Sequence, residues 1–572
     1  MDLFGTAGIR GDARERVTPG LALAVGRAIG IDAAGTSTSS DSDSDSNASS
    51  DDRSSDDGDG DREPTSAEHR AGRDGRGRPT GAGDEADGTA NPTTATAGGV
   101  VIGRDGRVTG TALLAALEAG IESAGARVHR AGVLPTPALA YASRGRRGVM
   151  VTASHNPPAD NGIKCFEDGE EYDRAGEGRI ERRVAERVEP AAFEEWETGE
   201  RIEPLPGYRE AVRTYARGHG TSLEGLTVAV DCANGVSGLA TPQVLRALGA
   251  EVVALHANVD GFFPGRPSKP TAETLGDLRA FVAGESGAAN EGYEEGEGSE
   301  ADTTSETGET SDGSDVDLAI AHDGDGDRVV VLDGEGEIVH EDTIVAILAE
   351  RYTRASDAGD PVVVTTPNAS SRIDERVEAA GGRIERVQLG ALHEGIAAAR
   401  EDGTEETSVV FAAEPWKHIH PAFGPWIDGV VSAAVVSRLV ADADLDILRG
   451  PIAEQPYEKT EVDCPDDRKR DAMDRLETRL PEIFPGATVT TEYGVRLDMD
   501  AGDGAGAESG EAETGAEDGE DRDETVAGGW VLVRPSGTEP YLRIYVESES
   551  VGAVRDRVLG VVESAIGDAE RE

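Results

Sequence analysis

The sequence has few cysteines and few basic residues for its length. Its 572 residues include only 3 cysteines, Cys165, Cys232 and Cys464, which are too few and too scattered for a disulfide framework or a zinc site. Acidic residues outnumber basic ones by 112 to 55, which gives a formal net charge of -57. Because nucleic-acid binding requires a basic surface that meets the phosphates, this composition argues against a nucleic-acid partner.

Long apolar runs are also missing. No stretch approaches the roughly 18 apolar residues that span a bilayer, and residues 1–5 lack the basic and apolar regions of a signal peptide. We therefore expect a soluble cytoplasmic protein in a reducing compartment, with no membrane partner. Lysine is scarce, and most cations are arginine. Together with the net charge, this fits a halophilic protein kept soluble in high salt, where charge repulsion is screened.

Three segments have the composition of disordered insertions. They cover about residues 35–98, 284–315 and 501–527, and they are rich in Ser, Asp, Glu, Gly and Thr. Such segments bury too little apolar surface to offset chain entropy.

Outside these segments, short apolar strands alternate with helical patterns, which predicts mainly parallel α/β sheets. The expected strands include 99–105, which runs into a polar turn, a strand and loop at 132–137, and strands at 148–151, 226–231, 316–321, 361–366, 383–387, 408–411 and 541–546. The expected helices include 18–27, 111–124, 176–188, 341–351, 370–380 and 551–566.

A stiff loop at residues 152–158, Thr-Ala-Ser-His-Asn-Pro-Pro, follows the apolar run 148–151. Pro157 and Pro158 have fixed φ, and Asn156 precedes a proline, so the chain must break sharply here. The loop holds one small hydroxyl, Ser154, at a strand end, which suits a rigidly placed nucleophile. The alternative is a capping serine in a Pro-rich turn.

A second loop carries three carboxylates separated by glycines, Asp323, Asp325 and Asp327. Carboxylates at this spacing can surround one hard cation. The loop is not an EF-hand, because Arg328 and Gly334 occupy the sixth and twelfth positions, where that motif needs Gly and Glu. So few ligands leave open positions, which suits magnesium bridging to a phosphate. The alternative is a solvated acidic turn.

Two further loops combine polar groups. Residues 534–540, Arg-Pro-Ser-Gly-Thr-Glu-Pro, place an arginine, two hydroxyls and exposed backbone N–H groups together, which is typical of a phosphate cradle. Residues 389–393 and 414–418 follow expected strands, where α/β sheets place ligands.

Taken together, these motifs resemble those of the α-D-phosphohexomutase family, which comprises phosphoglucomutase, phosphomannomutase and phosphoglucosamine mutase. Residues 152–158, 323–328 and 534–540 match family motifs in the family's order, and the likeness covers the chain apart from the insertions. It implies an α/β fold in which three related α/β domains with mixed, mainly parallel sheets and a smaller α+β C-terminal domain with a mixed sheet surround one central cleft. The expected domains are 1–205, with the catalytic serine, 206–337, with the metal loop, 338–455, with the sugar-recognition loop, and 456–572, with the phosphate-binding loop.

The resemblance also implies the chemistry. Ser154 would be a phosphoserine, and Mg²⁺ would bind one of its oxygens together with Asp323, Asp325 and Asp327. The phosphoryl group would pass to a hexose 1- or 6-phosphate, with a hexose 1,6-bisphosphate as intermediate and activator, so the partners would be small sugar phosphates. The implied catalytic helpers are Arg10, Lys164 and His155, and the implied substrate-binding residues are Arg328, Gly390, Glu414, His418, Arg534, Ser536, Gly537 and Thr538.

The sequence departs from the family pattern in one loop. Family members usually carry Gly-Glu-x-Ser-Gly-His, in which the Glu and Ser contact sugar hydroxyls. Here Glu414 and His418 keep their relation, but Trp416 replaces the Ser and Lys417 the second Gly. An indole cannot reproduce a hydroxyl contact, although it could stack on a sugar face.

Three hypotheses therefore stand. The first is a Mg²⁺-dependent phosphoglucomutase or phosphomannomutase, the second a phosphoglucosamine mutase, and the third a catalytically silent protein that binds sugar phosphates.

Overall fold

The structure, a computed structural model, describes residues 3–5, 8–39, 99–284, 316–452, 454–499, 528–536 and 539–569. The predicted insertions lie almost entirely outside these residues. Two of the predicted substrate-binding residues, Gly537 and Thr538, also lie outside the described residues. The described residues form four sheets, one of seven strands, two of four and one of five. The expected domain boundaries near 205, 337 and 455 each fall between the last strand of one sheet and the first strand of the next.

The first unit contains a mixed sheet in the order β1-β5-β4-β2-β3-β7, and its seventh strand, β6, pairs with β5 off this path. Strands β4, β2, β3 and β7 run parallel, whereas β5 is antiparallel to both β1 and β4. Strands β2 and β4 are buried along most of their length, as expected for parallel strands covered by helices on both faces. The elements are β1 (Ile9–Asp12), α1 (Pro19–Ser39), β2 (Val100–Arg104), α2 (Gly110–Ser123), β3 (Val128–Val133), α3 (Thr136–Ala142), β4 (Arg147–Val151), β5 (Asp160–Glu167), β6 (Glu170–Glu171), α4 (Arg174–Glu186) and β7 (Glu200–Arg201).

The second unit repeats the centre of the first. Its sheet has the order β11-β10-β8-β9, with β10, β8 and β9 parallel and β11 an antiparallel edge strand. The first unit's order β5-β4-β2-β3 has the same connectivity. The elements are α5 (Leu205–Ala216), β8 (Thr227–Asp231), α6 (Thr241–Leu248), β9 (Glu251–Leu255), α7 (Gly276–Val282), β10 (Leu318–Ala321) and β11 (Val330–Leu332).

The third unit has this topology again, in the order β15-β14-β12-β13. Strands β14, β12 and β13 are parallel, and β15 is antiparallel to β14. The elements are α8 (Glu341–Ala355), β12 (Asp360–Thr365), α9 (Arg372–Ala379), β13 (Arg383–Arg386), α10 (Leu392–Glu401), β14 (Thr407–Glu414), β15 (Lys417–Ile419), α11 (Gly429–Ala443) and α12 (Leu445–Arg449). The expectation of three related α/β units is therefore confirmed.

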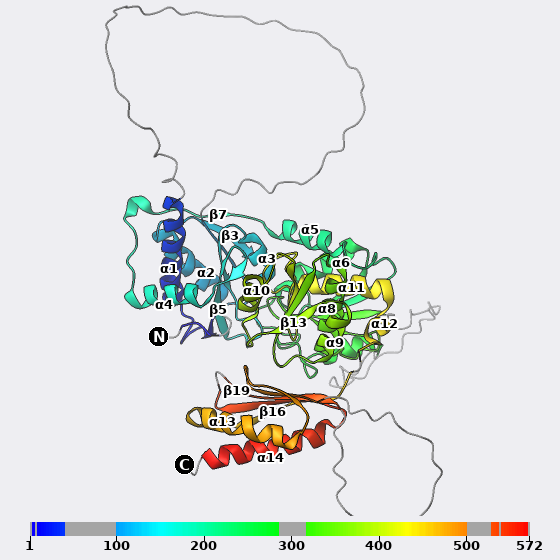
Figure 1. The fold of residues 1–572 in the computed structure, drawn as a ribbon. Helices are drawn as coiled ribbons and strands as arrows, with labels where there is room; N and C mark the ends of the chain where they lie inside the picture. Colours follow the sequence, from blue (N-terminus) through cyan, green and yellow to red (C-terminus); the bar gives the residue numbers. More distant parts are fainter. Residues whose placement is uncertain are drawn as a thin grey trace, which may run out of the picture.

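The fourth unit differs from the other three. Its sheet, β16-β20-β19-β18-β17, is antiparallel throughout, so the expected mixed sheet is wrong for this unit. Strands β17 to β20 form a meander, which needs no helical crossover between neighbours. Helices α13 and α14 cover the sheet face turned away from the other units (Figure 1). The elements are β16 (Tyr457–Asp463), α13 (Asp466–Ile483), β17 (Thr488–Thr490), β18 (Val495–Met499), β19 (Gly529–Pro535), β20 (Tyr541–Glu547) and α14 (Val551–Ala569).

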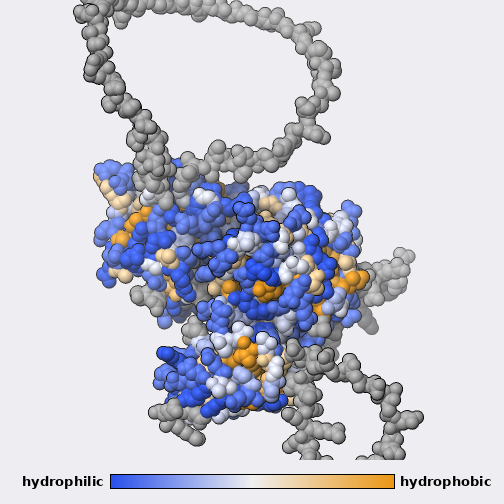
Figure 2. Space-filling view, in the orientation of Figure 1, coloured by the Kyte–Doolittle hydropathy of each residue, from blue (hydrophilic) through white to orange (hydrophobic). Residues whose placement is uncertain are grey.

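Apolar packing joins the first three units, and polar contacts hold the fourth. One hydrophobic cluster includes residues of all three α/β units, and helix α11 is buried within it. The fourth unit has its own cluster and contacts the third through Arg496, which donates to the carbonyls of Pro367 and Ala369. None of the described helices combines the length and apolarity that a membrane crossing needs. The face shown in Figure 2 is mainly hydrophilic, with small separated apolar patches.

Helices α1 and α2 approach so closely that only glycine fits at their crossing. A Cβ added at Gly120 would lie 2.3 Å from the carbonyl oxygen of Leu23, and one at Gly26 would lie 2.2 Å from that of Leu117. We predict that Gly120→Ala lowers the free energy of unfolding by about 1–3 kcal/mol, because backbone atoms must move apart. Thermal unfolding in high salt measures this. The matched control is Gly178→Ala in α4, where nothing lies within 4 Å of an added Cβ; an equal loss in the control would contradict the packing argument.

Candidate active site

The serine loop, residues 152–158, holds Ser154 in an unusual backbone conformation. Ser154 has φ = 53°, a left-handed value that costs a non-glycine residue about 1–2 kcal/mol. Its N–H donates to the Thr152 hydroxyl at 2.9 Å, and the Asn156 N–H donates to the Ala153 carbonyl at 3.1 Å. Ser154 is fully buried between the end of β4 and the second unit. Local contacts therefore fix the direction of its hydroxyl.

Arg107 braces this loop from beneath. Its side chain is fully buried and is paired with Asp105, whose carboxylate accepts from Nε at 3.0 Å. The other guanidinium donors reach four backbone carbonyls of the loop and the strand after it: Ser154 at 2.8 Å, Asn156 at 2.7 Å, Pro157 at 2.5 Å and Asp160 at 3.0 Å. A planar fork of donors suits this task because it satisfies several buried acceptors at once.

The aspartate loop, residues 322–328, brings three carboxylates to the serine. Asp323, Asp325 and Asp327 are buried, and one oxygen from each lies within 4.8 Å of the others. The Ser154 hydroxyl donates to Asp323 Oδ2 at 2.7 Å, although the two residues are 169 positions apart. Gly326 has φ = 75°, which lets the chain turn between the second and third carboxylate.

A metal ion fits this cluster. Asp325 Oδ1 and Asp327 Oδ1 are buried and have no hydrogen-bond partner among the described residues. Oxygen donors of this kind are the ligands of hard divalent cations. Burial and the neighbouring charges of Asp327 and Asp325 raise the pKa of Asp323 well above its usual range, as expected for crowded carboxylates in the absence of a cation.

Hydroxyl groups from the first unit also reach the aspartate loop. Thr136 donates to Asp325 Oδ2 at 2.7 Å. Thr152 donates to Asp105 Oδ2 at 2.7 Å, and its hydroxyl oxygen lies 3.3 Å from Asp325 Oδ2. Thr136 N–H also donates to the Asp325 carbonyl at 3.0 Å. The serine loop and the aspartate loop are thus joined by one buried hydrogen-bond network.

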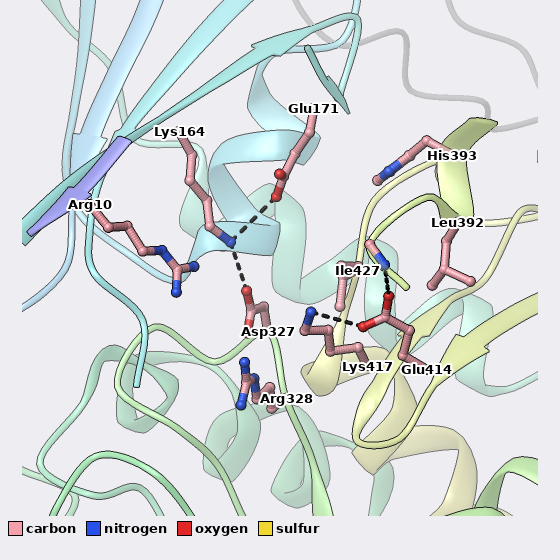
Figure 3. Close-up of a pocket in the computed structure, with 11 residues that line it drawn as sticks. Arg10, Lys164, Glu171, Asp327, Arg328, Leu392, His393, Glu414, Lys417 and Ile427 are labelled. Atoms are coloured by element: carbon pink, nitrogen blue, oxygen red, sulfur yellow. Dashed lines mark hydrogen bonds and ion pairs between the residues drawn. The ribbon is translucent and has the colours of Figure 1, made fainter. Parts of the chain in front are cut away.

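Lysine and arginine side chains surround the carboxylates. Lys164 Nζ lies 2.9 Å from Asp327 Oδ2 and 3.4 Å from Glu171 Oε1, and Figure 3 shows it between them. Burial alone lowers the pKa of Lys164, but Asp327 and Glu171 outweigh this effect and raise it, so the ammonium stays charged. Arg10 pairs with Gly162 in the neighbouring strand. Its side chain lines a small pocket together with Lys164 and Glu171, here called the inner pocket (Figure 3). Its Nε has no partner within the described part of the chain.

His155 and Arg328 complete the group around Ser154. The Nδ1 atom of His155 lies 3.3 Å from the Ser154 hydroxyl, and Arg328 Nε lies 3.8 Å from Asp323. Burial, followed by the charges of Arg328 and Arg10, lowers the pKa of His155 to about 2, so its imidazole is neutral.

The sugar loop, residues 414–418, forms the tight turn between β14 and β15. Glu414 accepts from the Gly390 N–H at 2.5 Å and pairs with Lys417 at 3.0 Å, and all three line the pocket. Trp416 does not face the pocket as a stacking platform; its indole packs against the hydrophobic cluster of the second unit. His418 is only 2% exposed and lies 3.0 Å from the Ser432 hydroxyl, inside the third unit, so it does not line the cavity.

One cavity of about 640 Å³ connects these groups with the fourth unit. His155, Arg328 and Glu414 line one side, and Arg534 and Ser536 of the phosphate loop line the other. Within that loop, Arg534 donates to the Tyr545 hydroxyl at 2.9 Å. Lys469 donates to the carbonyls of Ser536 and Glu539, which braces the turn. His155 of the serine loop and Ser536 of the phosphate loop therefore line one shared space.

Several residues of the site were not identified from the sequence. Tyr493 and Arg543 line the large cavity, Glu171 lines the inner pocket, and Arg107 braces the serine loop. Only Arg107 carried a local signal, since it lies in a polar turn directly after a strand. The others reach the site from distant elements, which no local pattern marks.

We predict that Arg107→Lys lowers the free energy of unfolding by about 2–3 kcal/mol, because the lysine keeps the charge but cannot satisfy all the buried carbonyls. Denaturant unfolding measures this. The control is Arg104→Lys, since Arg104 makes one hydrogen bond, to the Asp105 carbonyl at 2.8 Å. A loss no larger for Arg107→Lys than for Arg104→Lys would show that the brace is not needed.

Comparison with known proteins finds similar sequences along most of the chain. Family models for phosphoglucomutase/phosphomannomutase match at alpha/beta/alpha domain I (residues 85–190), alpha/beta/alpha domain II (207–336) and the C-terminal domain (499–563). The chain is 33% identical to a phosphopentomutase of Thermococcus kodakarensis, over 96% of this chain and 94% of the relative. It is also 33% identical to a probable phosphoglucosamine mutase of Methanopyrus kandleri, over 97% and 95%.

Solved structures show the same fold. A phosphoglucomutase/phosphomannomutase family protein of Burkholderia thailandensis superimposes with a TM-score of 0.68 at 21% identity, covering 100% of this chain and 98% of that one. A putative phosphomannomutase of Thermus thermophilus gives a TM-score of 0.60 at 19% identity, over 99% and 98%. With the matched domain models and the full-length relatives, these likenesses lead to one conclusion: the chain belongs to the phosphoglucomutase/phosphomannomutase family of α-D-phosphohexomutases.

Proposed function

We propose that the protein is a Mg²⁺-dependent mutase that moves a phosphoryl group between the two ends of a sugar monophosphate, through a phosphoserine at Ser154 and a bisphosphorylated sugar. The observation that carries this proposal is the 2.7 Å contact between the Ser154 hydroxyl and Asp323 within a buried carboxylate cluster. Three buried carboxylates beside a structural serine would serve no purpose. A phosphoserine needs a cation to offset its charge, and the three carboxylates supply the ligands for that cation.

Asp323, Asp325, Asp327 and one phosphoserine oxygen would hold the metal. When bound, Mg²⁺ would neutralise the carboxylates and draw charge from the phosphoryl oxygens. Lys164, Arg10 and Arg328 add positive charge around the transferred group, and positioning with electrostatic stabilisation supplies most of the catalysis in phosphoryl transfer.

In the first transfer, the bond between phosphorus and Ser154 Oγ breaks while a bond to a sugar hydroxyl oxygen forms. The proton of that hydroxyl ends on Ser154 Oγ, with Lys164 and His155 as the neighbouring groups that assist its movement. The bisphosphate then reverses its orientation within the cavity, and the second transfer returns its other phosphoryl group to Ser154. During each transfer, Arg534 and Ser536 would hold the phosphate that does not react. The Arg534 guanidinium is itself held by a hydrogen bond of 2.9 Å to the Tyr545 hydroxyl.

The first candidate substrate is a hexose phosphate, and a pentose phosphate is the second. The specific observation behind the second is that the sugar loop lacks the family's Ser and carries Lys417, in a chain similar over its full length to a protein named phosphopentomutase. Coupled assays with the 1-phosphates of glucose, mannose and ribose, together with glucosamine 6-phosphate, in high salt distinguish these substrates.

We predict that the protein as purified carries one phosphoryl group on Ser154 and that Ser154→Ala removes it. The same variant should lose mutase activity by on the order of 1,000-fold or more, as expected for a missing nucleophile. Intact-mass spectrometry of the purified protein, repeated after incubation with a sugar bisphosphate, measures the phosphoryl group, and the coupled assay measures the activity. Ser222→Ala, at an exposed serine, is the control. A Ser154→Ala protein that still turned over substrate would refute the mechanism, and a wild-type protein with neither phosphate nor activity would favour a silent binding protein.

A further inference from the structure

The sugar loop presents an ion pair to the cavity. Glu414 and Lys417 are direct cross-strand partners at the ends of β14 and β15, and Lys417 Nζ lies 3.0 Å from Glu414 Oε2. The Glu414 side chain is 12% exposed and that of Lys417 is 22% exposed, on the side of the pocket that faces Arg328 and Asp327 (Figure 3). The second Glu414 oxygen accepts from the Gly390 N–H. Both carboxylate oxygens are thus already engaged.

The turn itself holds Lys417 in this position. Pro415 and Trp416 form the two-residue connection between the strands, and Trp416 has a left-handed φ of 66°. A proline followed by a residue with positive φ is the pattern of a type II turn. The Trp416 indole packs on the second unit, its carbonyl accepts from the Val329 N–H at 3.1 Å, and Lys417 forms an isolated β-bridge with Arg328. Contacts on the second unit therefore anchor the turn and aim Lys417 into the cavity.

An ammonium in this place changes what the pocket can recognise. Lysine only donates hydrogen bonds, and it has two donors left after pairing with Glu414. The carboxylate keeps lone pairs that accept from a sugar hydroxyl, but its charge is balanced by Lys417. Arg10, Lys164 and Arg328 add positive charge to the same pocket. Its other carboxylates, Asp327 and Glu171, already have Lys164 as their partner.

We propose that Lys417 determines the substrate class: by taking Glu414 as its partner, it adapts the pocket to neighbouring hydroxyls of a neutral sugar phosphate and removes the free carboxylate that a protonated sugar amine would need. This inference rests on the proposed function, because it assumes that the pocket holds a sugar phosphate. An amine bound here meets a balanced carboxylate among cations, so its binding is weakened at least about tenfold relative to a hydroxyl in the same place.

The test compares two ligands that differ at one group. Glucose 6-phosphate and glucosamine 6-phosphate are titrated into the Mg²⁺-loaded full-length protein by calorimetry, at a pH of about 6.5, where an ordinary amine is protonated. The wild-type protein should bind the amino sugar at least about tenfold more weakly. Lys417→Met keeps the length of the side chain and frees Glu414, so the ratio of the two dissociation constants should shift at least about tenfold towards the amino sugar.

Two further variants test whether the change in the ratio of dissociation constants is specific to removing the Lys417 charge. Glu414→Gln leaves Lys417 without its partner, so the amino sugar should bind no better relative to glucose 6-phosphate than it does to wild type. Arg201→Met removes a cation whose side chain is 81% exposed and that lines neither the pocket nor the large cavity, so it should leave the ratio unchanged.

Equal binding of the two sugars by wild type, an unchanged ratio in Lys417→Met, or no binding of either sugar would overturn the inference. Because the readout is equilibrium binding, these outcomes are distinct from a failure of the proposed function, which would appear as missing phosphoserine and missing turnover.

Discussion

The site depends on the placement of one hydroxyl against a buried cluster of carboxylates. Three buried aspartates that lie close together repel one another when they are ionised. The raised pKa of Asp323 expresses that conflict, although Lys164 and Arg328 outweigh the effect of burial and lower the pKa of Asp327. A divalent ion resolves it, and the Ser154 hydroxyl, 2.7 Å from Asp323, lies where it would share that ion. With a phosphoserine dianion and a bound metal, Lys164, Arg328 and Arg10 would bring the site close to charge balance. The site is thus an exception within a chain of net charge -57, because cations gather at this one place.

The repeated topology explains how these groups meet. In each α/β unit, the chain leaves a parallel strand and returns as its antiparallel neighbour: β4 to β5, β10 to β11 and β14 to β15. The serine loop, the aspartate loop and the sugar loop occupy this same connection in the first, second and third units. Three equivalent loops therefore converge on one cavity, and the fourth unit adds its phosphate loop from the opposite side. The carboxyl ends of parallel strands are where open α/β sheets bind their ligands.

Much of the fold and the centre of the site could be predicted from the sequence, because their signals are local. The apolar runs before Ser154 and Asp323, the prolines at 157 and 158 and the Gly-spaced aspartates each specify their own loop. The antiparallel fourth sheet was missed because the mixed sheet expected there came from the family resemblance and not from the strand pattern. Trp416 was a candidate for sugar stacking, but its orientation is decided by the apolar surface of the second unit. The brace of Arg107 depends on contacts far apart in sequence, and the buried His418 lies against the Ser432 hydroxyl inside the third unit.

The central claim is that Asp323, Asp325, Asp327 and Ser154 form one divalent-metal site. Anomalous scattering from crystals soaked in Mn²⁺, which accepts the same oxygen ligands as Mg²⁺, tests it most directly. The account predicts one strong peak bounded by the three carboxylates and in contact with the Ser154 oxygen or its phosphate. Manganese bound only elsewhere on this acidic surface, with the aspartate loop empty, would contradict it.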